Sequence, residues 1–506
     1  MLARIRTAAL FGLDAVLVFA EVDVSNGFPG LTLVGLPDAS VRESGDRVRT
    51  AIRNSGFDYP RTRITVNLSP ADVRKVGAGF DLPIALGVLA AGGVVPARSL
   101  DDCLVVGELS LDGGIQPTRG VLPAMVAARR AGLRRVILPT ANAAEAAIVP
   151  DTAIVAVDTL DHVVTALRDP TTVAPWTPPD AATAAPEASA PDLADVDGQP
   201  MARRALEIAA AGAHHLLLSG PPGCGKTMLA RRLPGLLPEL DVDAAIEVTA
   251  IHSVAGLLAP GAGLIRTRPF RAPHHTISDA ALVGGGSQPR PGEVTLAHHG
   301  VLFLDEMPEF TRRALEVLRQ PLEEGAVSIA RAARTAHFPA RFQLVAAMNP
   351  CPCGFAGHPR RVCRCTPQAV QQYAARLSGP LRDRIDLSAD LPAVPLTALT
   401  FGASGEATSA EVRARVAAAR ARQADRYLAR GVSIRVNGAS TGRDIRRHAV
   451  LTPAARRLIT QAADRLGLSA RAHDRVLRVA RTIADLSDCD AVTDTHIGEA
   501  LQFRGS

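Results

Sequence analysis

The spacing of apolar residues in the first third of the chain predicts strands that alternate with helices. Residues 63–68 (RITVNL) are apolar at every second position, which is typical of a strand with one buried face. Residues 80–93 (FDLPIALGVLAAGG) are apolar almost throughout, which predicts a helix buried on all sides. Further strands are expected at 103–111, 134–139 and 152–157, with a helix at 121–132. This order predicts an N-terminal domain of the α/β or α+β class.

After residue 200 the pattern predicts a parallel sheet followed by a helical region. A helix is expected at 201–215, and three short apolar strands follow at 215–220 (HLLLSG), 300–306 (GVLFLDE) and 342–350 (FQLVAAMNP). The long stretches between these strands predict crossover helices, so the strands should be parallel. The Arg-rich amphipathic segments 411–431, 451–467 and 469–486 predict a C-terminal helical unit.

A linker divides the chain. Residues 171–200 are rich in Pro, Ala, Thr and Asp, lack apolar periodicity, and contain the only tryptophan, Trp176. Such a composition predicts a mobile or extended segment. We therefore divide the chain into an N-terminal domain (1–170), a flexible linker (171–192), a central core (193–400) and a helical domain (401–506).

Composition and charge add an expected partner and compartment. The net charge of +6 and the pI of about 9.2 suit a nucleic-acid partner, and equally a merely basic enzyme. Residues 1–22 resemble a secretory signal peptide, but Asp14 interrupts the apolar run and no clear cleavage site follows. No apolar run reaches the ~18 residues of a membrane span. We expect a cytoplasmic protein that does not contact membranes and keeps its thiols reduced.

A phosphate-binding loop follows the first strand of the central core. The sequence matches G-x-x-x-x-G-K-[ST] in full and opens a predicted helix, a context that supports ATP binding. Its residues are Gly220, Pro221, Pro222, Gly223, Cys224, Gly225, Lys226 and Thr227. Backbone N–H groups in such a loop surround a polyphosphate, the lysine binds the β- and γ-phosphates, and the threonine hydroxyl binds Mg²⁺. Lys226 is one of only two lysines, beside 54 arginines (56 − 2), so a compact charge is needed here.

Polar residues end the next two strands. Asp305 and Glu306 follow an apolar run, and we expect Asp305 to hold Mg²⁺ and Glu306 to polarise the attacking water. Asn349 ends the following strand, where it is expected to contact the γ-phosphate or the water, although Asn-Pro also commonly ends strands. In the loop 377–387, Arg382 and Arg384 are either surface charges or arginines that complete a neighbouring subunit's site.

Four of the seven cysteines lie within fifteen residues. Cys351, Cys353, Cys363 and Cys365 form two Cys-x-Cys pairs that can surround one structural Zn²⁺, with His358 as an alternative ligand. Free thiols and a redox switch are the alternatives. A metal there would hold the loop that leaves Asn349. The isolated Cys103, Cys224 and Cys489 are expected to be ordinary buried thiols, and the pairs His214-His215, His274-His275 and His298-His299 to be structural.

These motifs, in this order, resemble those of AAA+ ATPases. GPPGCGKT, LFLDE, AAMN and LRDRIDL are followed by a helical lid, and PGEVTLAHH before GVLFLDE resembles the magnesium chelatase and MCM helicase branch. RPFRAPHHTIS, VGGGSQPRPGE and NPCPCG resemble the ComM/YifB group of Mg-chelatase-like proteins, and the resemblance covers nearly the whole chain. It implies an α/β fold with a Lon-like (ribosomal S5 domain 2-like) domain, a linker, an AAA+ core with a parallel sheet, and a helical lid.

The resemblance also implies roles for several arginines. Arg384 is at the arginine-finger position, with Arg382 the weaker candidate, and Arg471 matches the sensor-2 arginine of the lid. Residues 325–342 resemble a hairpin that related helicases direct into a central pore, with Arg331 and Arg334 near its turn. Segment 250–299 is expected to carry an insert of this branch.

The N-terminal domain resembles the Lon protease domain without its catalytic dyad. The turn VGAGFDLP has no serine and the helix at 121–132 has no lysine, so covalent proteolysis is not expected. A scaffold or DNA-binding platform is the expected role, and Lys75 is either a phosphate contact or a surface lysine.

The family resemblance implies a hexameric, ATP-driven motor that translocates on DNA and promotes branch migration in recombination or natural transformation. The alternative is a chelatase-type motor driving a partner in metal insertion or protein remodelling. No metal-coordinating integrin-like domain is recognised in the sequence, so that activity would require a separate partner.

Overall fold

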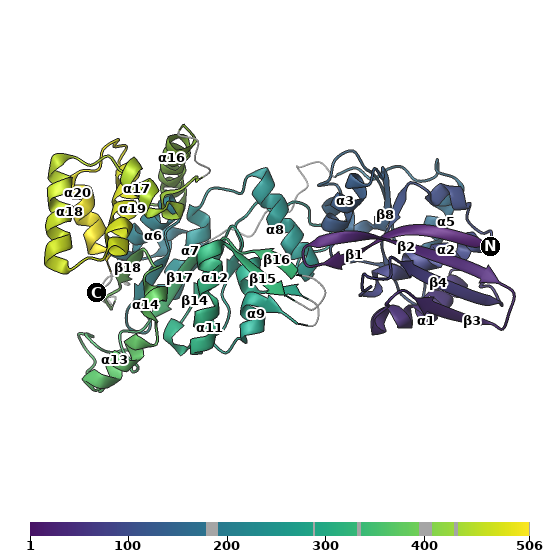
Figure 1. The fold of residues 1–506 in the computed structure, drawn as a ribbon, viewed down its shortest axis with the longest axis horizontal. Helices are drawn as coiled ribbons and strands as arrows, with labels where there is room; N and C mark the ends of the chain where they lie inside the picture. The colour runs from purple at the N-terminus through teal and green to yellow at the C-terminus, as the bar shows by residue number, and fades with distance from the viewer. Residues whose placement is uncertain (179–190, 287–288, 331–334, 394–406, 430–433, 505–506) are drawn as a thin grey trace.

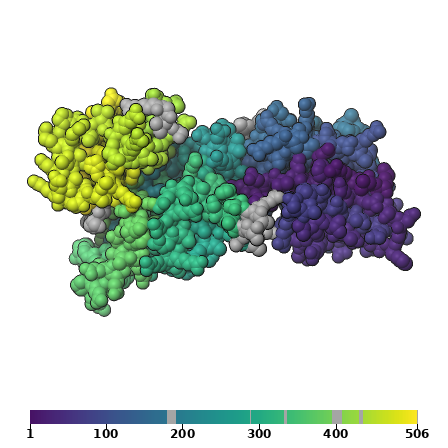
Figure 2. Space-filling model, in the orientation of Figure 1, coloured from purple at the N-terminus to yellow at the C-terminus, as the bar shows by residue number. Residues whose placement is uncertain are grey.

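The computed structural model describes residues 1–178, 191–286, 289–330, 335–393, 407–429 and 434–504. The molecule is elongated. The N-terminal domain lies at one end, the central core in the middle and the C-terminal helices at the other end (Figures 1 and 2). In the described part of the chain, no helix is both long and apolar enough to cross a membrane.

The N-terminal domain is a seven-stranded mixed sheet covered by helices. Its strand order is β3-β4-β2-β1-β5-β8-β9. These strands are β1 (Leu2–Phe11), β2 (Asp14–Ser25), β3 (Gly30–Val34), β4 (Arg63–Ser69), β5 (Cys103–Val105), β8 (Arg135–Pro139) and β9 (Ala153–Val157), and β6 (Glu108–Leu109) and β7 (Ile115–Gln116) form a separate ribbon. The helices are α1 (Ala39–Asn54), α2 (Asp81–Ala91), α3 (Val121–Arg130), α4 (Ala143–Ala146) and α5 (Leu160–Arg168). Every residue of α2 is buried, as its apolar sequence predicts.

The first residues of the chain form an antiparallel hairpin in the middle of this sheet. β1 pairs with β2 from Leu2 opposite Asp23 to Phe11 opposite Asp14. Asp14 interrupts the apolar run because it begins β2 after the turn. The resemblance of residues 1–22 to a signal peptide therefore comes from two strands with buried alternate positions.

Two details of the domain differ from the sequence predictions. The strand expected at 103–111 is divided because Gly107 packs against α2, where a Cβ would lie 2.9 Å from Leu82 Cδ2. Trp176, expected in a mobile linker, packs against the hydrophobic cluster around α3. Its backbone N–H donates to the carbonyl of Ile154 at 2.8 Å. Residues 179–190 of that linker lie outside the described residues.

Lys75 is neither a surface lysine nor an exposed phosphate contact. Its side chain is fully buried and donates to the carbonyl of Pro70. Burial lowers the pKa of this amine. Backbone bonds between Lys75 and both Leu36 and Asp38 hold the segment in place, so we assign Lys75 a structural role.

The central core is a five-stranded parallel sheet, as predicted. Its order is β11-β14-β17-β10-β18, and every pair is parallel. The strands are β10 (Leu216–Ser219), β11 (Phe270–Arg271), β14 (Val301–Leu304), β17 (Gln343–Met348) and β18 (Leu387–Asp390). Because the strands run in one direction, the residues that follow β10, β14 and β17 meet at one edge of the sheet.

Helices and two hairpins surround this sheet. The helices are α6 (Pro200–Gly212), α7 (Lys226–Leu236), α8 (Val242–Ala255), α9 (Asp279–Val283), α10 (Glu293–Leu296), α11 (Arg312–Val317), α12 (Arg319–Glu324), α13 (Pro367–Ala375) and α14 (Gly379–Arg382). One hairpin joins β12 (Gly284–Gly285) to β13 (Arg290–Pro291), within the expected insert at 250–299. The other joins β15 (Ala326–Ala330) to β16 (Thr335–Pro339), as predicted, although Arg331 and Arg334 lie outside the described residues.

The C-terminal helices pack onto the core. They are α16 (Ser409–Leu428), α17 (Gly442–His448), α18 (Pro453–Leu466), α19 (Ala470–Leu486) and α20 (Asp494–Gln502). Both α16 and α19 pack against α6, and one hydrophobic cluster extends from the sheet into these helices. A buried polar contact adds to this packing, because His214 bonds Asp386 at 3.1 Å and Thr482 of α19 at 2.8 Å.

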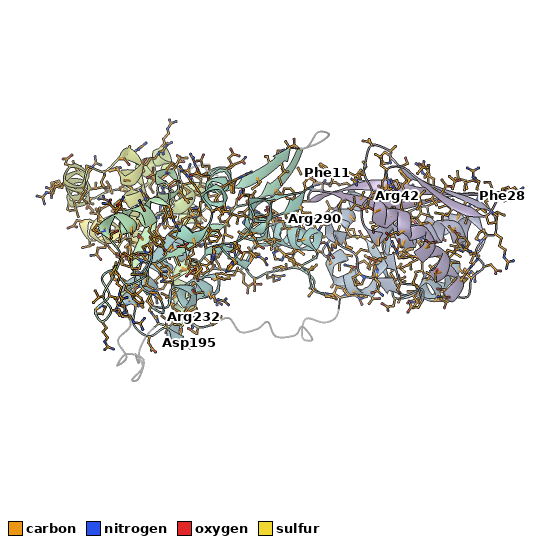
Figure 3. The ribbon with its side chains drawn as sticks, turned by 90° about the horizontal axis from the view of Figure 1, so that it is seen from below. Phe11, Phe28, Arg42, Asp195, Arg232 and Arg290 are labelled. Carbon is orange, nitrogen blue, oxygen red and sulfur yellow. The ribbon has the colours of Figure 1, made fainter. Side chains whose placement is uncertain are left out.

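The N-terminal domain and the core meet at two places. The β1–β2 turn reaches the core, where Phe11 and Leu13 pack against its apolar cluster; Figure 3 shows Phe11 at this junction. At the second place, the buried carboxylate of Glu145 accepts bonds from the Leu122 N–H at 2.7 Å and from the hydroxyl of Ser253 on α8. Helices α3 and α4 of the N-terminal domain are thus connected to α8 of the core.

Candidate nucleotide and metal sites

The phosphate-binding loop joins β10 to α7 and depends on its glycines. Gly223 and Gly225 have φ angles of +79° and +95°, which residues with a Cβ rarely adopt. A Cβ on Gly220 would lie 2.5 Å from the carbonyl oxygen of Leu391. Pro221 and Cys224 are buried and Pro222 is exposed, so the loop presents its backbone to one side. The α7 N-terminus adds unpaired N–H groups that favour an anion.

Lys226 and Thr227 connect this loop to the two neighbouring strands. The Lys226 amine donates to the carbonyls of Gly220 at 2.6 Å and Pro221 at 3.0 Å, and to Asn349 Oδ1 at 3.1 Å. The Thr227 hydroxyl donates to Asp305 Oδ2 at 2.6 Å. These two hydrogen-bonded pairs stand on adjacent residues at the start of α7 and form one group with the ends of β14 and β17. The Lys226 amine is placed to exchange its carbonyl partners for phosphate oxygens.

Glu306 lies beside this group and is more open to solvent. Its N–H donates to Asp305 Oδ1 at 3.0 Å, its φ is +50°, and its side chain is 52% exposed. His275 Nδ1 lies 3.8 Å from Glu306 Oε2, and its ring stacks near His274. Sequence analysis treated His275 as structural and did not indicate that it lies near Glu306. His275 follows β11, and β11 pairs in parallel with β14. This pairing places the residues after β11 near Glu306, which follows β14.

The two arginines predicted as the finger and the sensor-2 residue form ion pairs within this chain. Arg384 pairs with Glu323 of α12, and Arg471 lies 3.7 Å from Asp383. Burial lowers the pKa of Arg384, and the nearby guanidinium groups of Arg319 and Arg471 lower it further. These arginines therefore gather on one face. Arg382 instead donates to the Ala374 carbonyl at the end of α13 at 2.7 Å.

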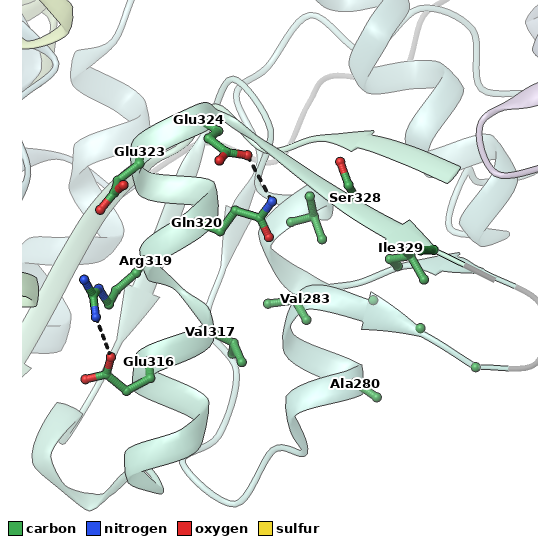
Figure 4. A pocket seen from close by; sticks show the side chains of 15 residues that line it. Ala280, Val283, Glu316, Val317, Arg319, Gln320, Glu323, Glu324, Ser328 and Ile329 are labelled. Atoms are coloured by element: carbon green, nitrogen blue, oxygen red, sulfur yellow. Dashed lines mark hydrogen bonds and ion pairs between the residues drawn. The ribbon is translucent and has the colours of Figure 1, made fainter. Parts of the chain in front are cut away.

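A groove of about 650 Å³ lies next to this face, between α9, α12 and β15 (Figure 4). Its wall carries Glu316, Glu323 and Glu324; Glu316 pairs with Arg319 at 3.1 Å. None of the described residues that line this groove belongs to the phosphate-binding loop, so we do not assign the groove to ATP.

The cysteine cluster has the geometry of a four-sulfur metal site. The Sγ atoms of Cys351, Cys353 and Cys363 are 3.4–3.6 Å apart, and all four sulfurs, including that of Cys365, lie within 4.8 Å of one another. Four sulfurs about 2.3 Å from a tetrahedral zinc would be about 3.8 Å apart. His358 is not part of this group, and its Nδ1 accepts the backbone N–H groups of Arg360 and Arg361.

Backbone N–H groups support thiolates in this cluster. Ala356 N donates to Cys351 Sγ at 3.3 Å and Cys365 N to Cys363 Sγ at 3.4 Å. Hydrogen bonds from the backbone of Phe355 and Arg364 lower the pKa of the Cys353 thiol to about 6, whereas burial and hydrogen bonds with the other cysteines raise the pKa of Cys363 to about 12 and also raise that of Cys365. A bound cation would therefore be needed for all four to be thiolates. A soft divalent cation needs thiolates, so the donor set fits zinc.

A second group of potential ligands does not fit a metal. Glu247 Oε2 lies 2.8 Å from His298 Nε2 and 2.9 Å from His299 Nε2, a proximity that the sequence did not reveal. The backbone N–H of Arg341 donates to His298 Nδ1 at 2.9 Å, so the neutral ring carries its proton on Nε2 and donates it to Glu247. Burial lowers the pKa of His298 to about 4, which keeps it neutral. These bonds leave no free ring nitrogen on His298 for a metal, so we interpret the pair as structural.

Gln199 is another residue that sequence analysis missed. Its side-chain amide donates to the carbonyls of Cys224 at 3.3 Å and Pro392 at 2.8 Å, and its φ is +57°. It thus braces the phosphate-binding loop from the start of α6. The dipeptide Gly-Gln before a helix gave no local signal for this long-range contact.

Comparison with known proteins gives matches over most of the chain. The family models described as "Magnesium chelatase, subunit ChlI", "Subunit ChlI of Mg-chelatase" and "Magnesium chelatase, subunit ChlI C-terminal" match residues 192–399, 20–142 and 406–504. Competence protein ComM of Haemophilus influenzae is 46% identical over 99% of this chain and 97% of its own length. The uncharacterized protein YifB of Salmonella typhimurium is 44% identical over 99% and 97%. In the N-terminal region, a Lon protease of Chloroflexus aurantiacus is 32% identical over 31% of this chain and 20% of its own length.

Proposed function

Because this chain belongs to the magnesium chelatase ChlI-like family of AAA+ ATPases, which includes ComM and YifB, we propose that it is an ATP-driven motor acting on DNA. The observation that carries the ATPase part is the hydrogen-bonded group of Lys226, Asn349, Thr227 and Asp305 at the edge of the parallel sheet. Phosphoryl transfer requires such positioning and charge neutralisation more than covalent chemistry.

In this proposal each side chain has one role in hydrolysis. Lys226 binds the β- and γ-phosphates, and the oxygen donors Thr227 and Asp305 hold Mg²⁺, which neutralises phosphate charge when bound. Glu306 orients the attacking water and accepts its proton. Asn349 contacts the γ-phosphate or the water. His275 restrains the Glu306 carboxylate from the neighbouring strand end.

We propose that Arg384 and Arg471 act on nucleotide bound between neighbouring subunits. Their gathering on one face, away from any bond to the phosphate-binding loop among the described residues, supports action in trans for Arg384. A neighbour's triphosphate would compete with Glu323 for the guanidinium. This arrangement requires an oligomer, and a hexameric ring is the form that we propose.

DNA is the proposed substrate of the motor. The basic composition supports it, as does the similarity to a protein named for competence. The two hairpins β12–β13 and β15–β16 lie side by side, and exposed Arg290 is on the first. In the proposed ring these hairpins contact phosphates, and ATP hydrolysis drives branch migration in recombination or transformation. The N-terminal domain (1–170) then serves as a non-proteolytic platform and residues 401–506 as the lid, in the cytoplasm.

The proposal also includes a metal. The cysteine loop holds one structural Zn²⁺, supported by its four clustered sulfurs.

A second candidate function is a motor for a metal-insertion partner. The chelatase names of the matching family models favour it.

The experiment that separates the two functions measures ATP hydrolysis by the full chain with and without a DNA junction. DNA stimulation and DNA binding support the DNA motor. Hydrolysis that is indifferent to DNA, with no DNA binding at low salt, would favour the partner-driven function.

A further inference from the structure

The cysteine loop lies directly against the phosphate-binding loop. Gly354, between the two Cys-x-Cys pairs, has a φ of +81°, and a Cβ on it would lie 2.7 Å from Pro222 Cδ. The backbone at Gly354 therefore packs on the Pro222 ring with no room for a side chain. The next glycine of the loop, Gly357, has a similar φ of +74° but faces open space. The contact with Pro222 is thus specific to Gly354.

A second connection runs through Asn349. Its side chain accepts the bond from Lys226 at 3.1 Å, and fully buried Cys351 follows two residues later. A backbone hydrogen bond joins Asn349 to the Tyr373 hydroxyl on α13, the helix that begins just after Cys365. Asn349 precedes the cysteine loop and Tyr373 follows it, so both ends of the loop are connected to the residue that accepts the Lys226 hydrogen bond.

We propose that metal occupancy of the four thiolates controls nucleotide binding through these two contacts, an inference that rests on the proposed ATP and zinc sites. With a divalent soft cation bound, the sulfurs hold the loop closed, Gly354 supports Pro222, and Asn349 keeps its bond to Lys226. Without the cation, only weak hydrogen bonds between the sulfurs close the loop, and it is free to open. The site then loses support on both sides, so zinc availability regulates the motor.

The first test measures the affinity of the full-length protein for a fluorescent ATP analogue. Zinc content is measured on the same samples, before chelation, after it, and after zinc is added back. Zinc removal should weaken binding about tenfold, the size expected for losing a hydrogen bond to a charged group, and zinc should restore it. Cys363→Ser/Cys365→Ser should reproduce the metal-free affinity, and Cys489→Ser, a thiol outside the cluster, should not.

A matched pair of glycine variants separates the contact from the metal. Gly354→Ala and Gly357→Ala introduce the same left-handed backbone strain, but only the first places a methyl group against Pro222. Gly354→Ala should retain one zinc per chain and weaken nucleotide binding, whereas Gly357→Ala should leave both unchanged.

The outcomes of these tests distinguish failure of the zinc coupling from failure of the proposed ATPase function. Zinc-bound protein whose nucleotide affinity is unchanged by zinc removal would overturn the coupling and leave the ATPase proposal intact. A protein that binds nucleotide but no zinc would overturn the metal assignment. Zinc-loaded protein without nucleotide affinity would instead contradict the proposed ATPase function.

Discussion

At the scale of single residues, short motifs indicate the groups that we propose to contact nucleotide, but they do not indicate the groups that we propose to restrain them. Lys226, Thr227, Asp305 and Asn349 could be predicted because each follows a strand in a short motif, and the structure joins them by hydrogen bonds. His275, by contrast, contacts Glu306 only because two strands pair, a tertiary contact that the motifs do not encode.

Two substitutions should separate nucleotide binding from hydrolysis. Lys226→Ala should abolish binding of ATP because it removes the charge opposite the phosphates. Glu306→Gln should bind ATP normally and lower the turnover number by about 10²- to 10⁴-fold, the usual contribution of a general base. Equilibrium binding and steady-state hydrolysis check both. Normal hydrolysis by Glu306→Gln would exclude its proposed role.

The trans role of Arg384 can be tested by mixing variants. Arg384→Ala has an intact phosphate-binding loop and Lys226→Ala an intact finger, so each should be inactive alone. Mixed oligomers contain interfaces where one chain supplies Lys226 and its neighbour Arg384, so hydrolysis should reappear on mixing. Recovery to a fraction of wild-type activity is expected, and its absence in verified mixed oligomers would argue against sharing of the site. Arg384→Lys is the control for charge without the planar group.

At the scale of elements, strands and helices with clear periodicity were predicted, and those defined by a partner were not. β4, α2 and β17 follow the predicted segments. The β1–β2 hairpin was missed because two alternating strands joined by a tight turn have the composition of one apolar segment. Between α10 and β14, His298 is buried by residues that are distant in the sequence, so its burial could not be predicted from the local pattern.

His298, in the segment before β14, should lower the free energy of unfolding at acidic pH. Its pKa is about 4 in the fold and about 6.5 when unfolded, so the unfolded chain binds more protons between these values. Its contribution to stability is present above pH 6.5 and falls by about 1 kcal/mol per pH unit below it. His298→Asn, which retains an acceptor for the Arg341 N–H, should flatten the dependence of the thermal midpoint on pH. Equal pH dependence in both proteins would contradict this assignment.

At the scale of the whole molecule, the order of the parts could be predicted but their contacts could not. The motifs indicated a Lon-like domain, a sheet-based core and a helical lid, in agreement with the structure. The attachment of the first two through Glu145 and Ser253 depends on residues more than a hundred positions apart and lies outside any motif.

DNA binding should be electrostatic and involve the β12–β13 hairpin. A surface that neutralises about four phosphates loses about 100-fold in affinity between 50 and 200 mM salt. Arg290→Ala should weaken binding of all sequences alike and reduce the logarithmic salt slope by about 1. Arg457→Ala, an equally exposed change on α18, is the matched control. An unchanged slope in Arg290→Ala would remove this hairpin from the DNA contact.

The most direct test of the motor is strand exchange on a labelled four-way DNA junction by the purified full-length protein. Conversion of the junction to its products should require ATP and should be lost in Glu306→Gln, which still binds ATP and DNA. Robust ATP hydrolysis by the zinc-loaded protein at low salt, without DNA binding or strand movement, would contradict the account.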